Sequence, residues 1–288
     1  MAHRLLHILT LIVVFISAGL WSCVKNNPES IPSYINVDTC YVKTEYLLAG
    51  TQDHKITDVW LYVNEELIGA FETPVTIPVL DDGIANIRLK PGIKANGISD
   101  ARELYPFLDP YEITTRITRD SVVTINPTYE YREGATFAWK EDFDDVRVSM
   151  KKTSRSDTTV VITTNPEEVF EGGYSGKITL TEDKDFFEII TDTAYVLPQG
   201  TSKVFLEMNY KTESTITVGL YVNGYSTMEQ VSVLNLNPSA EWNKIYVNLT
   251  TAVNSDGNAL DYSVFIGGFI TDGVTMEENF IDNLKLIY

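Results

Sequence analysis

The sequence predicts an all-β protein in which two β-sandwich domains follow a short N-terminal targeting segment. Short runs rich in β-branched and aromatic residues recur from Ile31 onward, and Gly, Pro, Asn and Asp interrupt them at short intervals. Nothing between Ile31 and Ile125 keeps a sustained helical period of apolar residues. With 288 residues, the chain is long enough for two domains after such a segment.

Residues 1–22 are expected to be a signal peptide. Arg4 supplies a positive charge, and a mostly apolar run from Leu5 to Ile16 follows it, before the small residues at 17–19. A charged, an apolar and a small-residue region in this order are typical of a secretory signal. The apolar run is also shorter than the roughly 18 residues that a transmembrane helix needs.

The end of this segment resembles the lipobox of bacterial lipoprotein precursors. Leu20, Ser22 and Cys23 match the pattern, whereas Trp21 is bulkier than the usual small residue. The resemblance implies that lipid, palmitate included, is attached to Cys23. Because Val24 rather than Asp follows the cysteine, it also implies a cell outer-membrane protein, which we expect to face the cell surface. An ordinary signal peptide with an accidental cysteine is the alternative.

The composition limits the classes of partner. A hydrophobic content of 44% and an aromatic content of 11% are sufficient for folded cores. The formal net charge is −18, so the chain repels phosphate backbones and anionic lipid surfaces. We therefore expect no nucleic-acid partner, and attachment to the membrane through lipid alone. Once Cys23 is acylated, Cys40 has no disulfide partner and is expected to be a small buried residue.

Residues 23–30 are polar and are expected to form a lipidated tether, and residues 31–134 are expected to form the first sandwich. The turn segments 64–66 and 81–83 each lie between two β-prone runs, and both predict hairpins. Short strands at regular spacing indicate an immunoglobulin-like sandwich. The run from Asp58 to Gly69 also resembles a hairpin of small surface-appendage domains in bacterial envelope proteins.

The second sandwich is expected over residues 135–288. Three motifs follow one another there: Glu-Asp-Phe-Asp at 141–144, Gly-Tyr-Ser-Gly-Lys at 173–177 and Ile-Asp-Asn-Leu-Lys-Leu at 281–286. Together they resemble the galactose-binding-like jelly rolls, which include carbohydrate-binding modules attached to glycoside hydrolases. The resemblance implies a jelly-roll fold for this half of the chain.

Alternating side chains along four runs of this half suggest a binding face. Each run has one aliphatic side, expected to be the core, and an opposite side that mixes aromatic rings with Glu and Asn. Rings of this kind can stack on sugars, while amides and carboxylates bond hydroxyl groups. If the strands are neighbours in one sheet, they form a single glycan-binding surface. The predicted ligand-binding residues are Phe205, Glu207, Asn209, Tyr221, Asn223, Tyr246, Asn248 and Phe265. The alternative is an ordinary outer sheet face, or one that the first domain covers.

One metal site is suggested by the jelly-roll resemblance. Asp144 and Asp282 match positions at which related jelly rolls often bind a structural calcium ion. Calcium prefers six to eight oxygen ligands, so backbone carbonyl groups within 171–175 would have to contribute. The alternative is that both acids lie at solvated strand ends.

No catalytic constellation can be recognised in the sequence. After the signal peptide the chain holds one histidine, His54, and no nucleophile motif accompanies it. Acid pairs such as 167–168 and 182–183 could serve a glycosidase, but a chain with 40 acidic residues contains such pairs by chance. We therefore expect a protein that is not an enzyme.

Two functions remain open. The first hypothesis is a cell-surface lipoprotein that binds an unidentified glycan through its C-terminal jelly roll. The second is a structural or adhesion lipoprotein that docks on an outer-membrane protein complex and uses the aromatic face for protein. A third hypothesis, a glycosidase, has the least support.

Overall fold

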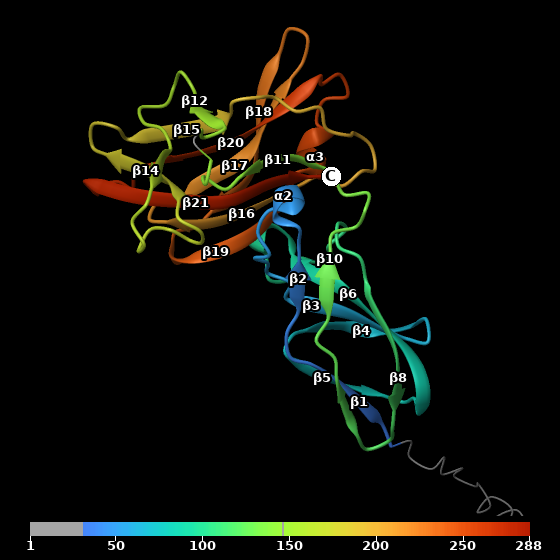
Figure 1. Cartoon of the computed structure of the whole chain (residues 1–288). Helices are drawn as coiled ribbons and strands as arrows, with labels where there is room; N and C mark the ends of the chain where they lie inside the picture. Colours follow the sequence, from blue (N-terminus) through green and yellow to red (C-terminus); the bar gives the residue numbers. More distant parts are fainter. Residues whose placement is uncertain (1–30, 146) are drawn as a thin grey trace, which may run out of the picture.

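The computed structural model describes residues 31–145 and 147–288, so the expected signal peptide, Cys23 and the tether lie outside the described residues. The fold is all-β and built from β-sandwiches, as the sequence predicts (Figure 1). Within these ranges, no helix is both long and apolar enough to span a membrane. We call residues 31–134 the N-terminal region and residues 135–288 the C-terminal region.

The strands of the N-terminal region pair in the orders β5-β1-β9, β10-β2 and β4-β3-β6-β7, and β8 pairs with β6. A short helix, α2 (Tyr46–Ala49), and a 3-10 turn, η1 (Ala95–Gly97), lie between strands. The strands are β1 (Ser33–Val37), β2 (Tyr41–Lys43), β3 (Asp58–Val63), β4 (Glu66–Glu72), β5 (Val75–Val79), β6 (Gly83–Lys94), β7 (Arg102–Leu104), β8 (Tyr111–Ile117), β9 (Val122–Thr124) and β10 (Thr128–Glu130).

One of the two predicted hairpins is confirmed and the other is wrong. β3 pairs antiparallel with β4, and the turn between them holds Asn64 and Glu65 at positive φ. β5, however, pairs with β1, whereas β6 pairs with β3 and β8. The segment between β5 and β6 therefore carries the chain from one sheet to another. Ile77 of β5 and Ile87 of β6 enter the same hydrophobic cluster from these two sheets. The alternation of apolar and polar residues in both strands is therefore satisfied although the strands do not pair with each other.

The C-terminal region forms two sheets and one short helix, α3 (Thr250–Val253). The six-stranded sheet has the order β13-β14-β21-β16-β19, with β11 paired to β21. The five-stranded sheet has the order β12-β15-β20-β17-β18. The strands are β11 (Phe137–Glu141), β12 (Met150–Lys152), β13 (Val161–Thr163), β14 (Ser175–Thr181), β15 (Phe186–Thr191), β16 (Phe205–Thr212), β17 (Ile216–Asn223), β18 (Met228–Leu236), β19 (Ser239–Asn248), β20 (Asp261–Phe269) and β21 (Met276–Ile287).

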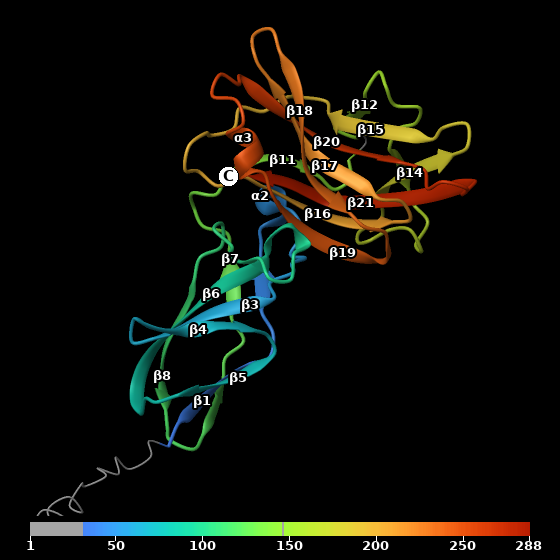
Figure 2. The ribbon, with the colours of Figure 1, turned by 180° about the vertical axis from the view of Figure 1, so that it is seen from behind.

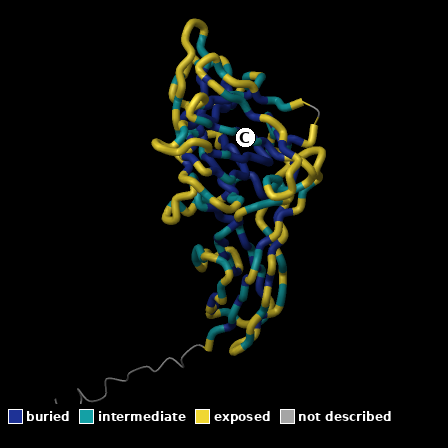
Figure 3. The backbone as a smooth tube through the Cα atoms, turned by 90° about the vertical axis from the view of Figure 1, so that its left-hand side faces the viewer, coloured by how far each residue is buried: buried dark blue, intermediate teal, exposed yellow. Residues whose placement is uncertain are grey.

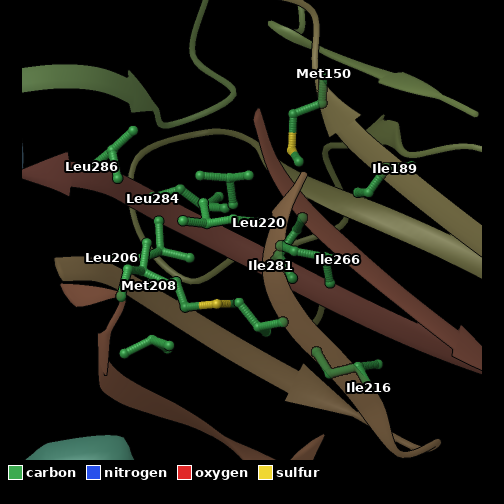
Figure 4. Close-up of a cluster of buried hydrophobic side chains, with 14 of the residues drawn as sticks. Met150, Ile189, Leu206, Met208, Ile216, Leu220, Ile266, Ile281, Leu284 and Leu286 are labelled. Atoms are coloured by element: carbon green, nitrogen blue, oxygen red, sulfur yellow. The ribbon is translucent and has the colours of Figure 1, made fainter. Parts of the chain in front are cut away.

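The aliphatic faces read from the sequence do form the core between these two sheets. Figure 4 shows Leu206 and Met208 of the six-stranded sheet beside Leu220 and Ile266 of the five-stranded sheet. All four side chains are fully buried. Because successive side chains of a strand point to opposite faces, the residues between them must point outward from the sandwich.

The two regions meet across the outer face of the six-stranded sheet. Figure 1 and Figure 2 show β16, β19 and β21 next to the N-terminal region, with the five-stranded sheet on the far side. Phe205, Tyr246 and Ile287 belong to the hydrophobic cluster of the N-terminal region although they come from the C-terminal one. Buried segments accordingly occur in both regions (Figure 3). Cys40 lies in the same cluster, and burial raises the pKa of its thiol to about 11.

Candidate functional site

The eight predicted ligand-binding residues do not form a single surface, so that expectation is wrong. β16 and β17 follow one another in the chain but belong to opposite sheets of the sandwich. Both strands turn their aliphatic sides toward the shared core, and their outer sides therefore point in opposite directions. The six-stranded sheet carries Phe205, Glu207, Asn209, Tyr246 and Asn248. The five-stranded sheet carries Tyr221, Asn223 and Phe265.

The first group lies beneath the N-terminal region. This is the alternative in which the first domain covers the outer face of the sheet, and we call this face the covered face. Tyr105 and Phe107 of the N-terminal region pack against Phe205 and Tyr246. The ring centroid of Tyr105 lies 4.9 Å from that of Tyr246, and both Tyr105 and Phe107 lie 5.9 Å from Phe205. All four side chains are buried. These rings form an interior aromatic cluster and leave no free face for a sugar.

Glu207 is the centre of the buried polar contacts between the two regions. Its Oε1 accepts hydrogen bonds from the hydroxyl groups of Tyr105 and Tyr131, the second at 2.7 Å. The Lys244 ammonium lies 3.2 Å from its Oε2. Burial would raise the pKa of Glu207, but the charges of Lys244 and Lys285 and the two hydroxyl groups bring it below its ordinary value. Glu207 is thus a buried anion.

The two asparagines of the covered face also join the regions. The Asn209 amide donates a 2.8 Å hydrogen bond to the carboxylate of Asp53, and the Asn248 backbone N–H donates to the side chain of Asn96 at 2.8 Å. The backbone N–H of Lys55 donates to the Tyr246 hydroxyl at 3.0 Å. Polar groups that looked like sugar ligands are therefore already bonded within the protein.

The second group lies on the outer face of the five-stranded sheet, which we call the open face. There the Nη2 of Arg155 donates to both oxygens of the Glu188 carboxylate, at 2.9 and 2.6 Å, and to the Tyr221 hydroxyl at 2.7 Å. The same nitrogen lies 2.9 Å from the side-chain oxygen of Gln230, so its two N–H groups are shared among four acceptor oxygens. Tyr221 donates to Glu188 at 2.9 Å, and the Gln230 amide donates to it at 2.8 Å. Four side chains from separate strands and a loop are thus fixed in one network.

The opposite charges of Glu188 and Arg155 stabilise each other in this network. Burial raises the pKa of Glu188, but hydrogen bonds from Arg155 and Tyr221 and the positive charge of Arg155 hold it below its ordinary value. The Glu188 side chain is 2% exposed, whereas that of Arg155 is 57% exposed. The carboxylate therefore stays ionised at neutral pH, and the guanidinium that holds it faces solvent.

Two adjoining hollows occupy the open face. The larger one has a volume of about 640 Å³, and its lining includes Lys151, Lys152, Arg155, Tyr221, Asn223 and Gln230. The smaller one has a volume of about 210 Å³, and its lining includes Arg155, Phe186, Glu188, Gln230, Phe265 and Phe269. Arg155 and Gln230 line both, so the two hollows share a wall. Pockets of a few hundred cubic ångströms are the usual size for small-ligand sites.

A pair of aromatic side chains, Phe186 and Phe269, lines the smaller hollow. The rings of Phe186 and Phe269 lie 4.5 Å apart with an interplanar angle of 33°, and Phe269 is 66% exposed. Phe265 is buried, and its ring packs edge-on against Tyr221 at 5.6 Å. An exposed ring beside fixed hydrogen-bonding groups can take a ligand that has both an apolar face and hydroxyl groups.

Sequence reasoning missed most of the open face. None of the predicted ligand-binding residues comes from the polar run 151–159, which contains Arg155. The alternation of β15 was a usable signal, because Phe187 and Ile189 are buried in the core and Phe186 and Glu188 face outward. No comparable signal identifies Arg155, which comes from a loop whose position depends on tertiary structure.

The proposed calcium ligands differ in their surroundings. Asp282 is buried in β21, where the Ser175 hydroxyl donates to it at 2.5 Å and burial raises its pKa to about 8. Asp144 is exposed and lines a hollow of about 610 Å³ with Asp53, Glu171 and residues near them. In the described ranges, no group of three or more His, Cys, Asp or Glu side chains could hold a metal ion by itself. Calcium here would need backbone or water oxygens in addition, and the site stays a prediction.

No protein-family model matches the sequence, and no curated protein matches it significantly. The fold is similar to that of solved β-sandwich structures. The C-terminal family 22 carbohydrate-binding module of Clostridium thermocellum Xyn10B is 14% identical, with a TM-score of 0.39, over 54% of this chain and 96% of that chain. The CBM22-2 xylan-binding domain from Paenibacillus barcinonensis Xyn10C is 14% identical, with a TM-score of 0.39, over 52% and 98%. A carbohydrate-binding module described as belonging to the β-sandwich superfamily is 14% identical, with a TM-score of 0.40, over 82% and 86%.

Proposed function

We propose that this protein is a non-catalytic, cell-surface lipoprotein that binds glycan on the open face of its C-terminal sandwich. The observation that carries the proposal is the pair of adjoining hollows, which combine an exposed aromatic pair with a fixed network of Arg155, Glu188, Tyr221 and Gln230. A sugar ring has C–H faces that pack on aromatic rings and hydroxyl groups that accept and donate hydrogen bonds. The open face offers both kinds of contact within one surface.

A binding role fits the chemistry of Glu188 better than a catalytic one. A glycosidase that works with two carboxylates uses one of them as a proton donor. Glu188 is held ionised by Arg155 and is already bonded by Tyr221 and Gln230. Such a carboxylate can accept a hydrogen bond and orient its neighbours, and it is poorly suited to donate a proton at neutral pH.

Calorimetry against a panel of polysaccharides tests the proposal. We expect weak binding, with a Kd roughly between micromolar and millimolar, because ring stacking contributes modestly per contact. Tyr221→Ala should abolish measurable binding, since it removes a wall of the larger hollow and two hydrogen bonds of the network. Because Tyr221 is 7% exposed, its loss could also disturb packing. Phe269→Ala is therefore the second variant, and it should weaken binding without changing the melting temperature.

A matched control is Tyr41→Ala, which removes an equally large ring from an exposed position in the N-terminal region. This variant should bind like the wild type. The whole chain must be used, because removing residues 31–134 would expose Phe205, Tyr246 and the Glu207 carboxylate to water. Binding that survives both Tyr221→Ala and Phe269→Ala would contradict the proposed site. If no polysaccharide binds, the outcome favours the alternative, docking on an outer-membrane protein complex.

We also propose that lipid on Cys23 anchors the protein to the outer membrane with its two regions facing outward. The lipobox-like residues Leu20, Ser22 and Cys23 support this proposal. Labelled palmitate should enter the wild-type protein, which should fractionate with membranes. Cys23→Ala should take up no label and should appear in the soluble fraction, while Cys40→Ala, the matched control, should remain labelled. A wild-type protein that takes up no fatty acid would contradict the anchor.

A further inference from the structure

The larger hollow of the open face has a charge opposite to that of the whole molecule. Its lining includes Lys151, Lys152 and Arg155, and none of its lining residues in the described part of the chain is Asp or Glu. The chain as a whole has a formal net charge of −18. The carboxylate of Glu188 balances Arg155, so the charges of the two lysines are left in excess at this surface.

The cationic groups of the hollow keep free hydrogen-bond donors. Within residues 31–145 and 147–288, the side chain of Arg155 donates its hydrogen bonds from Nη2, so the hydrogens on Nε and Nη1 remain available. The Lys151 ammonium donates to the backbone oxygen of Asp192 at 3.0 Å, and the side chain of Lys152 makes no hydrogen bond or ion pair with a described residue. Both lysines are exposed. An oxyanion is the group that such donors bond best, because charge-assisted hydrogen bonds are stronger than neutral ones.

We propose that the glycan this protein binds is anionic, a polysaccharide whose sugars carry carboxylate or sulfate groups. This inference rests on the proposed function and adds the class of ligand. An anionic substituent fits the larger hollow, against Arg155 and Lys152, and a neutral sugar face fits the smaller hollow, against Phe269. The net negative charge of the whole protein disfavours non-specific binding of an anionic polymer, so such a polymer needs a local excess of positive charge where it binds.

Matched pairs of polysaccharides test the class of ligand by calorimetry on the whole chain. The pairs are polygalacturonate with its carboxyl-reduced form, glucuronoxylan with unsubstituted xylan, and dextran sulfate with dextran. We expect the anionic member of at least one pair to bind about tenfold more tightly than its neutral partner in dilute buffer. Raising the salt concentration should reduce this difference, because exposed charges are screened. The carboxylate and sulfate pairs distinguish the two sources of negative charge.

Variants that neutralise the two lysines test whether the preference for anionic polysaccharides arises at the larger hollow. Lys151→Gln with Lys152→Gln should weaken binding of the anionic polymer by roughly tenfold, at about threefold for each exposed ionic contact. Binding of a neutral polymer should not change. Lys43→Gln removes one charge from an exposed position of the N-terminal region and serves as the control.

The possible outcomes separate the two proposals. Equal binding of the anionic and neutral members would overturn the anionic class and leave the glycan-binding function standing. An anionic preference that the double variant retains would overturn the assignment to this hollow. An absence of binding to every member would overturn the proposed function together with this inference.

Discussion

The two outer faces of the C-terminal sandwich look alike in the sequence and have opposite surroundings in the structure. Each carries aromatic rings alternating with Glu or Asn, and each has a carboxylate that is almost fully buried, Glu207 on the covered face and Glu188 on the open face. Glu207 is bonded by Tyr105 and Tyr131, which come from the N-terminal region, and paired with Lys244, which is 3% exposed. Glu188, in contrast, is paired with Arg155, which is 57% exposed.

The two faces differ in the energetic cost of breaking the ion pair, Glu207 with Lys244 on the covered face and Glu188 with Arg155 on the open face. Removing the charge of Glu207 takes the nearest counter-charge from the buried Lys244 ammonium and leaves it only the Asp53 carboxylate, at 3.7 Å. A buried charge that loses its main partner is expensive. Removing the charge of Glu188 leaves a guanidinium that water can solvate. The covered face therefore depends on its charges for stability, and the open face can use them for a ligand.

The largest expected effect is on stability, from Glu207→Gln. This change leaves Lys244 and Lys285 facing a neutral amide in a buried site, and it should lower the free energy of unfolding by about 3 to 5 kcal/mol. The matched change on the open face, Glu188→Gln, should lower it by about 1 kcal/mol. Denaturant unfolding monitored by tryptophan fluorescence measures both. Equal losses for the two variants would contradict the distinction between a covered and an open face.

A pH series sharpens the same comparison. The folded-state pKa of Glu207 lies below its ordinary value of 4.5, so its ionised form stabilises the folded protein above that pH. That contribution is lost as the pH falls through the folded-state pKa. The free energy of unfolding of the wild type should therefore fall more steeply on acidification below about pH 4.5 than that of Glu207→Gln. The other carboxylates titrate in both proteins and cancel in the difference, and parallel curves would contradict the role of Glu207.

The alternation of side chains was predictable from the sequence, and the covering of a face was not. Val218, Leu220, Val264 and Ile266 alternate with polar, aromatic or glycine residues, and all four are core residues. Alternation states only which side chains share a face of a strand. It does not state which strands are neighbours, and the assumption that all four strands lie in one sheet was the source of the error.

The site needed tertiary information for a different reason. Tyr221, Asn223 and Phe265 could be found because they lie in regular strands with a clear period. Arg155 lies in a loop, and its contact with Tyr221 joins residues 66 positions apart. The failed hairpin around residues 81–83 has a similar cause, since turn residues show that the chain reverses but not which strand the next one will pair with.

The smallest expected effect comes from calcium, and it tests whether an ion strengthens the covered side of the molecule. The hollow beside Asp144 is lined by Tyr46, Thr51 and Asp53 of the N-terminal region and by Glu171 of the C-terminal region. An ion held there would contact both regions. Among the described residues that line the two hollows of the open face, Glu188 is the one acid. Binding to the folded state alone would add about 1.4 kcal/mol at a calcium concentration ten times the Kd.

Such a gain corresponds to a rise of about 3 to 6 °C in the melting temperature of a chain of this size. Scanning calorimetry of the whole protein with calcium and with chelator measures it directly. Asp282→Asn and Asp144→Asn should each remove most of the difference, because each takes away a carboxylate oxygen that the ion would bind. Asp183→Asn, in the exposed turn between β14 and β15, is the control and should keep the difference. A melting curve that chelator leaves unchanged would remove calcium from the account, and the two regions would then be held together by the aromatic cluster and the Glu207 contacts without it.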